Sequence, residues 1–156
     1  MRLTNYKSVK IIPGFYYFSV VFFFLIIFLH YQFDGTMFSS DKYYYGTLGG
    51  IVLLQFYVYF GGKYFEYDSE GAILSIVNKG VILSEYLNYR GNVIEIKREQ
   101  LYKYKYYNFL IYKRMVIYAK GRNGVFKKHV NLTFVSNKKI SYVKHSLSKI
   151  IKENAY

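Results

Sequence analysis

The segment from Ile11 to Phe33 carries no formally charged residue and reads IIPGFYYFSVVFFFLIIFLHYQF. A helix of this length rises about 34 Å, which exceeds the roughly 30 Å hydrocarbon core of a bilayer. Pro13 falls in the first turn, where its missing N–H group leaves no hydrogen bond unmade. The alternative is a cleaved signal peptide, but the apolar run exceeds the usual signal core and no small-residue cleavage site follows. The segment therefore predicts a retained transmembrane helix over residues 11–33.

A second uncharged run spans Tyr43 to Gly62 and reads YYYGTLGGIVLLQFYVYFGG. Tyrosines near both of its ends are typical of the aromatic belts at the two membrane–water interfaces. The run predicts a second span over 43–62, so that residues 1–62 form a membrane α-hairpin. Gly46 and Gly50 have a spacing that lets another helix approach closely, and with Gln55 they are our candidates for helix packing. The alternative for the glycines is that they merely begin the helix.

The flanking charges predict the orientation of this hairpin. Arg2, Lys7 and Lys10 precede the first span, whereas the connecting loop holds Lys42 and two aspartates. Positive charge is retained on the cytoplasmic side. We therefore expect a multi-pass protein of the bacterial inner (cytoplasmic) membrane with both termini in the cytoplasm.

The remaining residues, 63–156, carry most of the positive charge. They hold eighteen of the 22 Lys and Arg residues and seven of the nine Asp and Glu residues, and so +11 of the formal net charge of +13. About ninety residues can bury one small core. The chain has no cysteine, which excludes a disulfide framework, a thiol nucleophile and a thiolate metal site.

Residues 63–156 alternate between apolar and polar residues with the period of a β-strand. Strand-like runs occupy residues 63–68, 72–79, 81–89, 92–99, 100–107, 110–120 and 125–135. Turn signals separate most of them, and Asn123-Gly124 lies between two β-rich runs as in a hairpin. The pattern predicts a small mainly-β domain, an antiparallel barrel or sandwich of about six to seven strands.

The run QLYKYKYY at 100–107 decides which side chains face outward. In a strand Tyr102, Tyr104 and Tyr106 share one face, which we expect to be the inner one. Lys103 and Lys105 then share the outer face with Leu101 and Tyr107. In the last run Val130, Leu132 and Phe134 alternate in the same way with His129, Asn131 and Thr133. Our candidates for contact with a membrane or a partner are the outward basic residues Lys103, Lys105, Lys113, Arg114 and Lys127.

A C-terminal amphipathic helix is expected over about 137–153, with Asn137 able to cap it. Its apolar stripe is formed by Ile140, Val143, Leu147, Ile150 and Ile151, with lysines on the other sides. Such a helix either packs against the β domain or lies on a membrane surface. We expect packing, because the stripe is narrow and has no aromatic residue.

The order of these elements, with the stretches KYFEYDSEG, IEIKREQL and ISYVKHSLSKII, resembles small bacterial membrane proteins with a pleckstrin-homology-like (PH-like) domain. The resemblance implies a strongly bent barrel closed by the terminal helix, in a class rich in interaction and assembly modules without catalysis. Phosphoinositide-binding members hold the headgroup with basic residues around the first strand–strand loop. Here the matching turn, Asp68-Ser69-Glu70-Gly71, carries two acids that repel phosphate, so we expect no inositol-lipid pocket.

No motif of an active site is found. The sequence has no Gly-rich phosphate loop, HExxH or GxSxG, and its histidines, His30, His129 and His145, are scattered. We predict no enzymatic activity, no cofactor and no metal site.

The leading functional hypothesis is a non-enzymatic inner-membrane protein whose basic domain is an assembly or interaction module at the anionic leaflet, as an accessory subunit of a membrane complex. Anionic lipids attract each nearby Lys or Arg by about 1 kcal/mol. The expected partners are these lipids and other membrane subunits or a second copy of the chain. The alternative is a membrane effector whose β domain binds a nucleotide or nucleic-acid signal, since tyrosines among basic residues can stack bases. The expected inward tyrosines weigh against nucleic acid.

Overall fold

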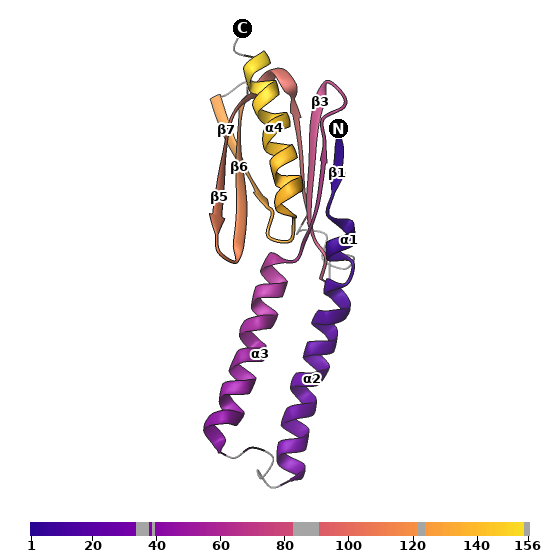
Figure 1. Ribbon diagram of the computed structural model, residues 1–156, viewed down its shortest axis with the longest axis vertical. Helices are drawn as coiled ribbons and strands as arrows, with labels where there is room; N and C mark the ends of the chain where they lie inside the picture. The colour runs from indigo at the N-terminus through magenta and orange to yellow at the C-terminus, as the bar shows by residue number, and fades with distance from the viewer. Residues whose placement is uncertain (34–37, 39, 83–90, 122–123, 155–156) are drawn as a thin grey trace.

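The molecule, in a computed structural model that describes residues 1–33, 38, 40–82, 91–121 and 124–154, is elongated. Two long helices form a stem, and a β domain with a C-terminal helix stands at one end of it (Figure 1). Both the start of the chain and the C-terminal helix lie at the β-domain end.

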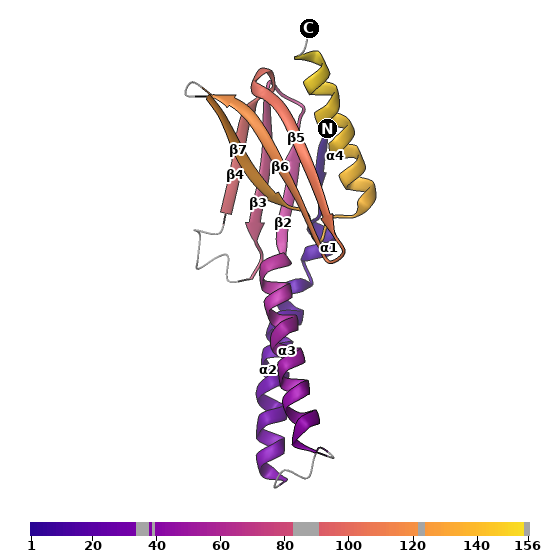
Figure 2. The same ribbon diagram turned by 90° about the vertical axis from the view of Figure 1, so that its left-hand side faces the viewer.

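The stem consists of α2 (Ile12–Gln32) and α3 (Asp41–Gly61), which run side by side in opposite directions (Figures 1 and 2). A short helix, α1 (Tyr6–Val9), leads into α2. Each long helix has 21 residues and is therefore about 32 Å long. Within the described part of the chain, one helical stretch, Tyr6–Gln32, is long and apolar enough to cross a membrane. The less apolar α3 does not meet that criterion, so its predicted span stays a prediction.

The first strand of the β domain precedes the stem. β1 (Arg2–Thr4) pairs antiparallel with β2 (Lys63–Asp68), which follows the stem, and Leu3 lies opposite Tyr67. The sequence prediction assigned all of 1–62 to the anchor, because a strand of three residues is too short to show a period. The β domain therefore takes residues from both sides of the stem, and the boundary at residue 62 is corrected.

Two antiparallel sheets make up the described part of the β domain. The first has the order β1-β2-β3-β4, with β3 at Ile73–Gly80 and β4 at Gly91–Lys97. A 3-10 turn, η2 (Arg98–Gln100), leads to the second sheet, ordered β5-β6-β7. Its strands are β5 (Leu101–Phe109), β6 (Tyr112–Gly121) and β7 (Gly124–Asn131). The mainly-β class is confirmed, whereas most of the predicted strand at 81–89 lies outside the described residues.

The two sheets share one core, and α4 (Asn137–Glu153) closes it on one side (Figure 1). Buried side chains come from both sheets and from the stripe of α4, including Phe65, Tyr67, Leu74, Ile76, Ile94, Ile96, Met115, Ile117, Val130, Ile140, Val143, Leu147 and Ile150. The hydroxyl group of Tyr67 donates to Ser146 Oγ at 2.8 Å, and that of Tyr104 lies 3.0 Å from Ser148 Oγ. The predicted helix and its inward stripe are confirmed.

One detail at the start of α4 differs from the prediction. Ser136, not Asn137, holds the N-cap position, and its side chain makes no capping hydrogen bond. The amide oxygen of Asn137 instead accepts a 2.8 Å hydrogen bond from Lys113 Nζ.

The pairing of β5 with β6 corrects the predicted alternation. Leu101 lies opposite Ala119, but Lys103 lies opposite Tyr118, so Tyr102 is an extra residue in a bulge. Leu101 is consequently buried, and Tyr102 is 52 % exposed. We had expected the reverse.

Beyond the bulge the predicted alternation holds. Tyr104 and Tyr106 pack against the core, and Lys103 and Lys105 are exposed. The last strand also differs: it ends at Asn131, which is buried rather than outward, and the following residues leave the sheet.

Candidate interaction surface on the β domain

The outer face of the three-stranded sheet gathers most of the predicted contact residues. Cross-strand partners share a face, so the register decides which side chains meet there. Lys103 and Lys127 flank Tyr118, and Lys105 and His129 flank Val116 in the next row. We call this surface the basic face and define it as Lys103, Lys105, Arg114, Lys120, Lys127 and His129.

No acidic side chain compensates the basic face within its own part of the chain. From Leu101 to Lys152 there are thirteen Lys and Arg residues and no Asp or Glu. Like charges that face each other across strands destabilise a sheet, and here they also create a positive potential over the surface. The basic face therefore suits a negatively charged partner.

Arg114 and His129 are linked at the edge of this surface. Arg114 Nη2 lies 2.6 Å from His129 Nδ1. Because a guanidinium group can only donate, Nδ1 of the imidazole accepts. Partial burial, followed by the nearby positive charges of Arg114 and Lys127, lowers the pKa of His129 from 6.5. The positive charge of the basic face near neutral pH thus comes from its lysines and its arginine.

Aromatic side chains lie among these charges, and of those named here the sequence prediction had placed Tyr107 alone on the outer face. Tyr118 is half-buried between two lysines, and the bulge turns Tyr102 outward with Lys120 Nζ 5.3 Å from its ring centroid. Tyr107, opposite Arg114, stacks on Phe109 with centroids 6.3 Å apart. The register shift at Tyr102 could not be read from an unbroken run of alternating Lys and Tyr.

Lys113 does not belong to the basic face. It neighbours Arg114 in β6, so its side chain points to the other side of the sheet, where Nζ donates to Asn137 Oδ1. The sequence pattern could not separate Lys113 from Arg114, because the start of the strand was uncertain. Of the five predicted contact residues the structure therefore brings together Lys103, Lys105, Arg114 and Lys127.

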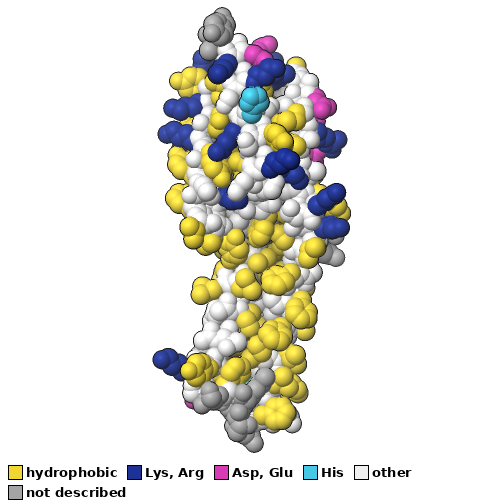
Figure 3. Space-filling model, in the orientation of Figure 1, with side chains coloured by type: hydrophobic (Ala, Val, Ile, Leu, Met, Phe, Trp, Pro, Cys, Tyr) yellow, Lys and Arg dark blue, Asp and Glu magenta, His cyan; other side chains and the backbone are white. Residues whose placement is uncertain are grey.

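The basic face points to the side of the molecule and not along the stem. Figure 2 shows the strands of this sheet running along the long axis, with the β5–β6 turn at the end nearest the helices. Lys103 precedes Phe109 at that turn by six residues, about 20 Å along a strand. In Figure 3 the Lys and Arg side chains gather over the β domain, whereas hydrophobic side chains cover the stem.

Buried asparagines join the stem to the β domain. The side chain of Asn78 donates to the carbonyl oxygen of Asn131 at 3.0 Å and accepts from its N–H group at 3.1 Å, which links the two sheets. The side chain of Asn131 in turn donates to the carbonyl oxygen of Phe60, in the last turn of α3, at 3.1 Å. Asn5 holds the other side through Lys63 and Phe65 of β2. These bonds fix the β domain on the stem.

The predicted packing residues of α3 take different positions. A Cβ atom added at Gly46 or Gly50 would meet nothing within 4 Å, so these glycines do not pack against α2. Gln55 is half-buried, and its Nε2 atom has no hydrogen-bond partner among the described residues. The helices meet instead through contacts such as His30 stacked on Tyr44, with ring centroids 3.7 Å apart.

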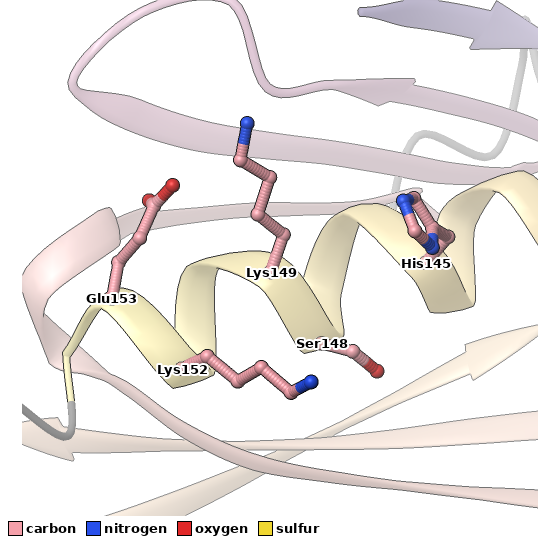
Figure 4. Close-up of a pocket in the computed structure, with 5 residues that line it drawn as sticks. All are labelled: His145, Ser148, Lys149, Lys152 and Glu153. Carbon is pink, nitrogen blue, oxygen red and sulfur yellow. The ribbon is translucent and has the colours of Figure 1, made fainter.

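A hollow of about 570 Å³ lies along α4 and is drawn in Figure 4. Lys149 and Glu153 point to one side of the helix, and Ser148 and Lys152 to another (Figure 4). Glu153 is paired with Arg98 at 3.2 Å, and Ser148 contacts Tyr104. The hollow thus offers lysines, His145 and a serine whose hydroxyl group is already hydrogen-bonded.

Two further observations bear on ligands. Among the residues that the structure describes, no group of three His, Asp or Glu could hold a metal ion. In the acidic turn after β2, Glu70 pairs with the N-terminal amino group at 3.2 Å, and Glu70 N–H donates to Asp68.

Comparison of the chain with protein-family models, with curated proteins and with solved structures finds no match.

Proposed function

We propose that this protein is a non-enzymatic, membrane-anchored interaction module of the bacterial inner membrane, built on a PH-like domain. A four-stranded and a three-stranded antiparallel sheet with a C-terminal helix closing one side support the PH-like assignment. The stem is inserted between β1 and β2, the first two strands of that domain.

The proposal takes both stem helices as membrane spans. α2 and α3 have the same length, and large apolar side chains on both remain exposed. On α3 these include Tyr43, Tyr45, Leu53, Leu54, Phe56 and Phe60. A helix that is apolar on all sides is stable in lipid and costly in water. The basic residues Arg2, Lys7 and Lys10 before the first span support a cytoplasmic β domain.

The observation that carries the proposal is the basic face, rigidly joined to an apolar stem. Screening limits the attraction of an anionic leaflet to about 10 Å. Lys103 lies about 20 Å along its strand from the turn nearest the stem, and Lys127 is in the same row, so both are beyond that range. Arg114 lies near the turn. We therefore assign the outer part of the basic face to an acidic surface of a neighbouring membrane subunit, and the part near the turn to anionic lipid. The open side of α3 at Gly46 and Gly50 leaves room for a helix of that subunit or of a second copy.

Purification of the full chain in a mild detergent tests this function. We expect a co-purifying acidic membrane subunit that is lost on triple charge reversal, Lys103→Glu with Lys105→Glu and Lys127→Glu. Lys97→Glu, an exposed charge reversal in the four-stranded sheet, is the matched control and should retain the partner. A partner that stays bound to the triple variant, or a wild-type chain that purifies alone, contradicts the proposal.

A second candidate function is supported by the aromatic side chains of the basic face. Tyr102, Tyr107 and Tyr118 lie on or beside it, and base stacking on such rings contributes about 1–3 kcal/mol per base. This arrangement favours, as the second candidate, a nucleotide- or nucleic-acid-responsive effector. Its test is binding of the full chain in detergent to a labelled single-stranded oligonucleotide and to cyclic nucleotides. Affinity that falls steeply with salt and is reduced by Tyr118→Ala supports this candidate, whereas no binding at low salt removes it.

A further inference from the structure

The turn between β5 and β6 exposes three consecutive apolar side chains. Phe109, Leu110 and Ile111 are 60 %, 100 % and 65 % exposed. Hairpin turns that face water normally carry polar residues, because turn backbone and side chains are both solvated. Gly, Asn or Asp could form this turn in water, so the choice of three apolar residues indicates that the turn is not surrounded by water. We call these three residues the apolar tip.

A hydrogen bond holds the apolar tip beside the end of the stem that meets the β domain. The hydroxyl group of Tyr57 donates to the carbonyl oxygen of Ile111 at 3.0 Å. Tyr57 lies four residues before the end of α3 at Gly61, which is about one helical turn. Figures 1 and 2 both place the β5–β6 turn next to this end of α3. The tip is thus level with the boundary where the stem enters the β domain.

The residues around the tip are ordered as at a membrane interface. Tyr107 stacks on Phe109 on one arm, and Lys113 and Arg114 follow Ile111 on the other. Tyrosine rings and basic side chains concentrate at the headgroup level, whereas apolar side chains enter about 5–10 Å into the acyl boundary. On α3, one residue before and three residues after Tyr57, Phe56 and Phe60 are exposed as well.

We propose that the apolar tip inserts into the leaflet that the stem enters and sets the β domain upright on it, with Arg114 at the headgroups. The occupant of this surface is lipid. The inference rests on the proposed membrane anchoring, because it needs the stem in the same bilayer. The stem and the part of the basic face near the turn are the first two contacts with the membrane, and the tip adds a third. This third contact sets the direction in which the basic face points.

Single introduced cysteines can test this insertion without background labelling, because the chain has no cysteine of its own. The full chain is reconstituted into liposomes with a fluorophore at Leu110→Cys, and quenching by lipids that carry a nitroxide near the headgroup is measured. Phe22→Cys, in the middle of α2 and about 15 Å from either end of that helix, reports whether the stem spans the bilayer when the nitroxide is carried deep on the acyl chain. Val125→Cys is the matched control: it is apolar, 57 % exposed and in the same sheet, but about 30 Å from the tip along β6. Aqueous iodide is the second quencher.

We expect lipid nitroxide to quench the Leu110 label several-fold more than the Val125 label, and iodide to do the reverse. Equal lipid quenching at the two sites overturns the inference. A Leu110 label shielded from both quenchers is covered by protein, which also overturns it. An unquenched Phe22 label shows that the stem lies outside the bilayer, so the failure of the anchor is distinguished from the failure of the tip.

Discussion

The two sheets of the β domain share a core but differ in charge. Residues 63–100, which supply three strands of the first sheet, carry five basic and six acidic residues, whereas residues 101–152 carry thirteen basic and none acidic. In the first sheet the acids are used internally: Glu66 pairs with Arg2 at 2.6 Å, and Glu70 pairs with the N-terminal amino group. The second sheet has no such partners of its own on the basic face.

This difference separates a sheet that binds its own chain from one that is available to a partner. The N-terminal strand completes the four-stranded sheet, and its positive charges pair with Glu66 and Glu70. The three-stranded sheet keeps Lys103 and Lys127 on either side of Tyr118, an arrangement that lowers stability slightly and favours an anionic partner. Four predictions test this comparison.

The largest effect is expected where the two sheets are joined. Asn78→Leu removes the side chain that bonds both backbone groups of Asn131 and leaves these groups buried without partners. The free energy of unfolding should fall by about 3 kcal/mol, measured by chemical denaturation in detergent. Asn108→Leu, an exposed asparagine in the second sheet, is the control and should change it little. Equal effects of the two substitutions would show that the sheets are not held together at Asn78.

Leu3→Pro should disrupt the first sheet alone. Asn5 N–H donates to Phe65 and Ser69 N–H to Met1, so the alternation directs the N–H group of Leu3 toward β2, where proline has none to offer. We expect a loss of about 2 kcal/mol beyond that of Leu3→Ala, which keeps the backbone group and serves as the control. If the two variants unfold at the same denaturant concentration, β1 is not part of the sheet.

Changing one charged side chain in each sheet should have different effects on stability. Glu66→Gln removes the charge and one of the two oxygens that accept from Arg2 and from the hydroxyl group of Tyr64, and should cost about 1 kcal/mol because the group is partly screened by solvent. Lys127→Glu places a negative charge near Lys103 and should leave stability unchanged or raise it by at most about 0.5 kcal/mol. A destabilisation by Lys127→Glu as large as that by Glu66→Gln would contradict the assignment of an uncompensated basic face.

Acid should weaken the two sheets in separate pH ranges. Hydrogen bonds from Tyr64 and Arg2 lower the pKa of Glu66 from 4.5. As the pH falls, Glu66 is therefore protonated in the unfolded chain before it is protonated in the folded one. The stability that its carboxylate contributes is complete above pH 4.5 and is lost as the pH falls through the lowered pKa.

The pKa of His129 is lowered from 6.5, mainly by burial. The unfolded chain therefore binds a proton at this residue more readily than the folded one, and the protein loses stability as the pH falls below 6.5. Denaturation curves recorded across both ranges should show a small step near each. Glu66→Gln should remove the step at lower pH and His129→Gln the other. A step that survives its own substitution contradicts the assignment.

Periodicity predicted the stem, most strand positions and α4 because long amphipathic or apolar segments determine their own structure. It could not find β1, whose three residues pair only because Asn5 and β2 hold them. The alternation of Lys and Tyr predicted the face of Lys103 and Lys105, but a bulge that depends on the pairing with β6 placed Leu101 inside and Tyr102 outside. The side to which Lys113 points depends on Asn137, a residue of another element. The position of the apolar tip next to the stem could not be predicted, because it depends on a hydrogen bond with Tyr57, which is 54 residues away in the chain.

The sidedness of the stem tests the account most directly. Ser40→Cys lies at the start of α3, at the far end of the stem, and Lys149→Cys lies on α4 in the β domain. A membrane-impermeant maleimide applied to intact spheroplasts should label Ser40→Cys and reach Lys149→Cys only after permeabilisation, since both helices would then cross the bilayer. Labelling of both cysteines from the same side would contradict a two-span anchor that carries a cytoplasmic basic domain.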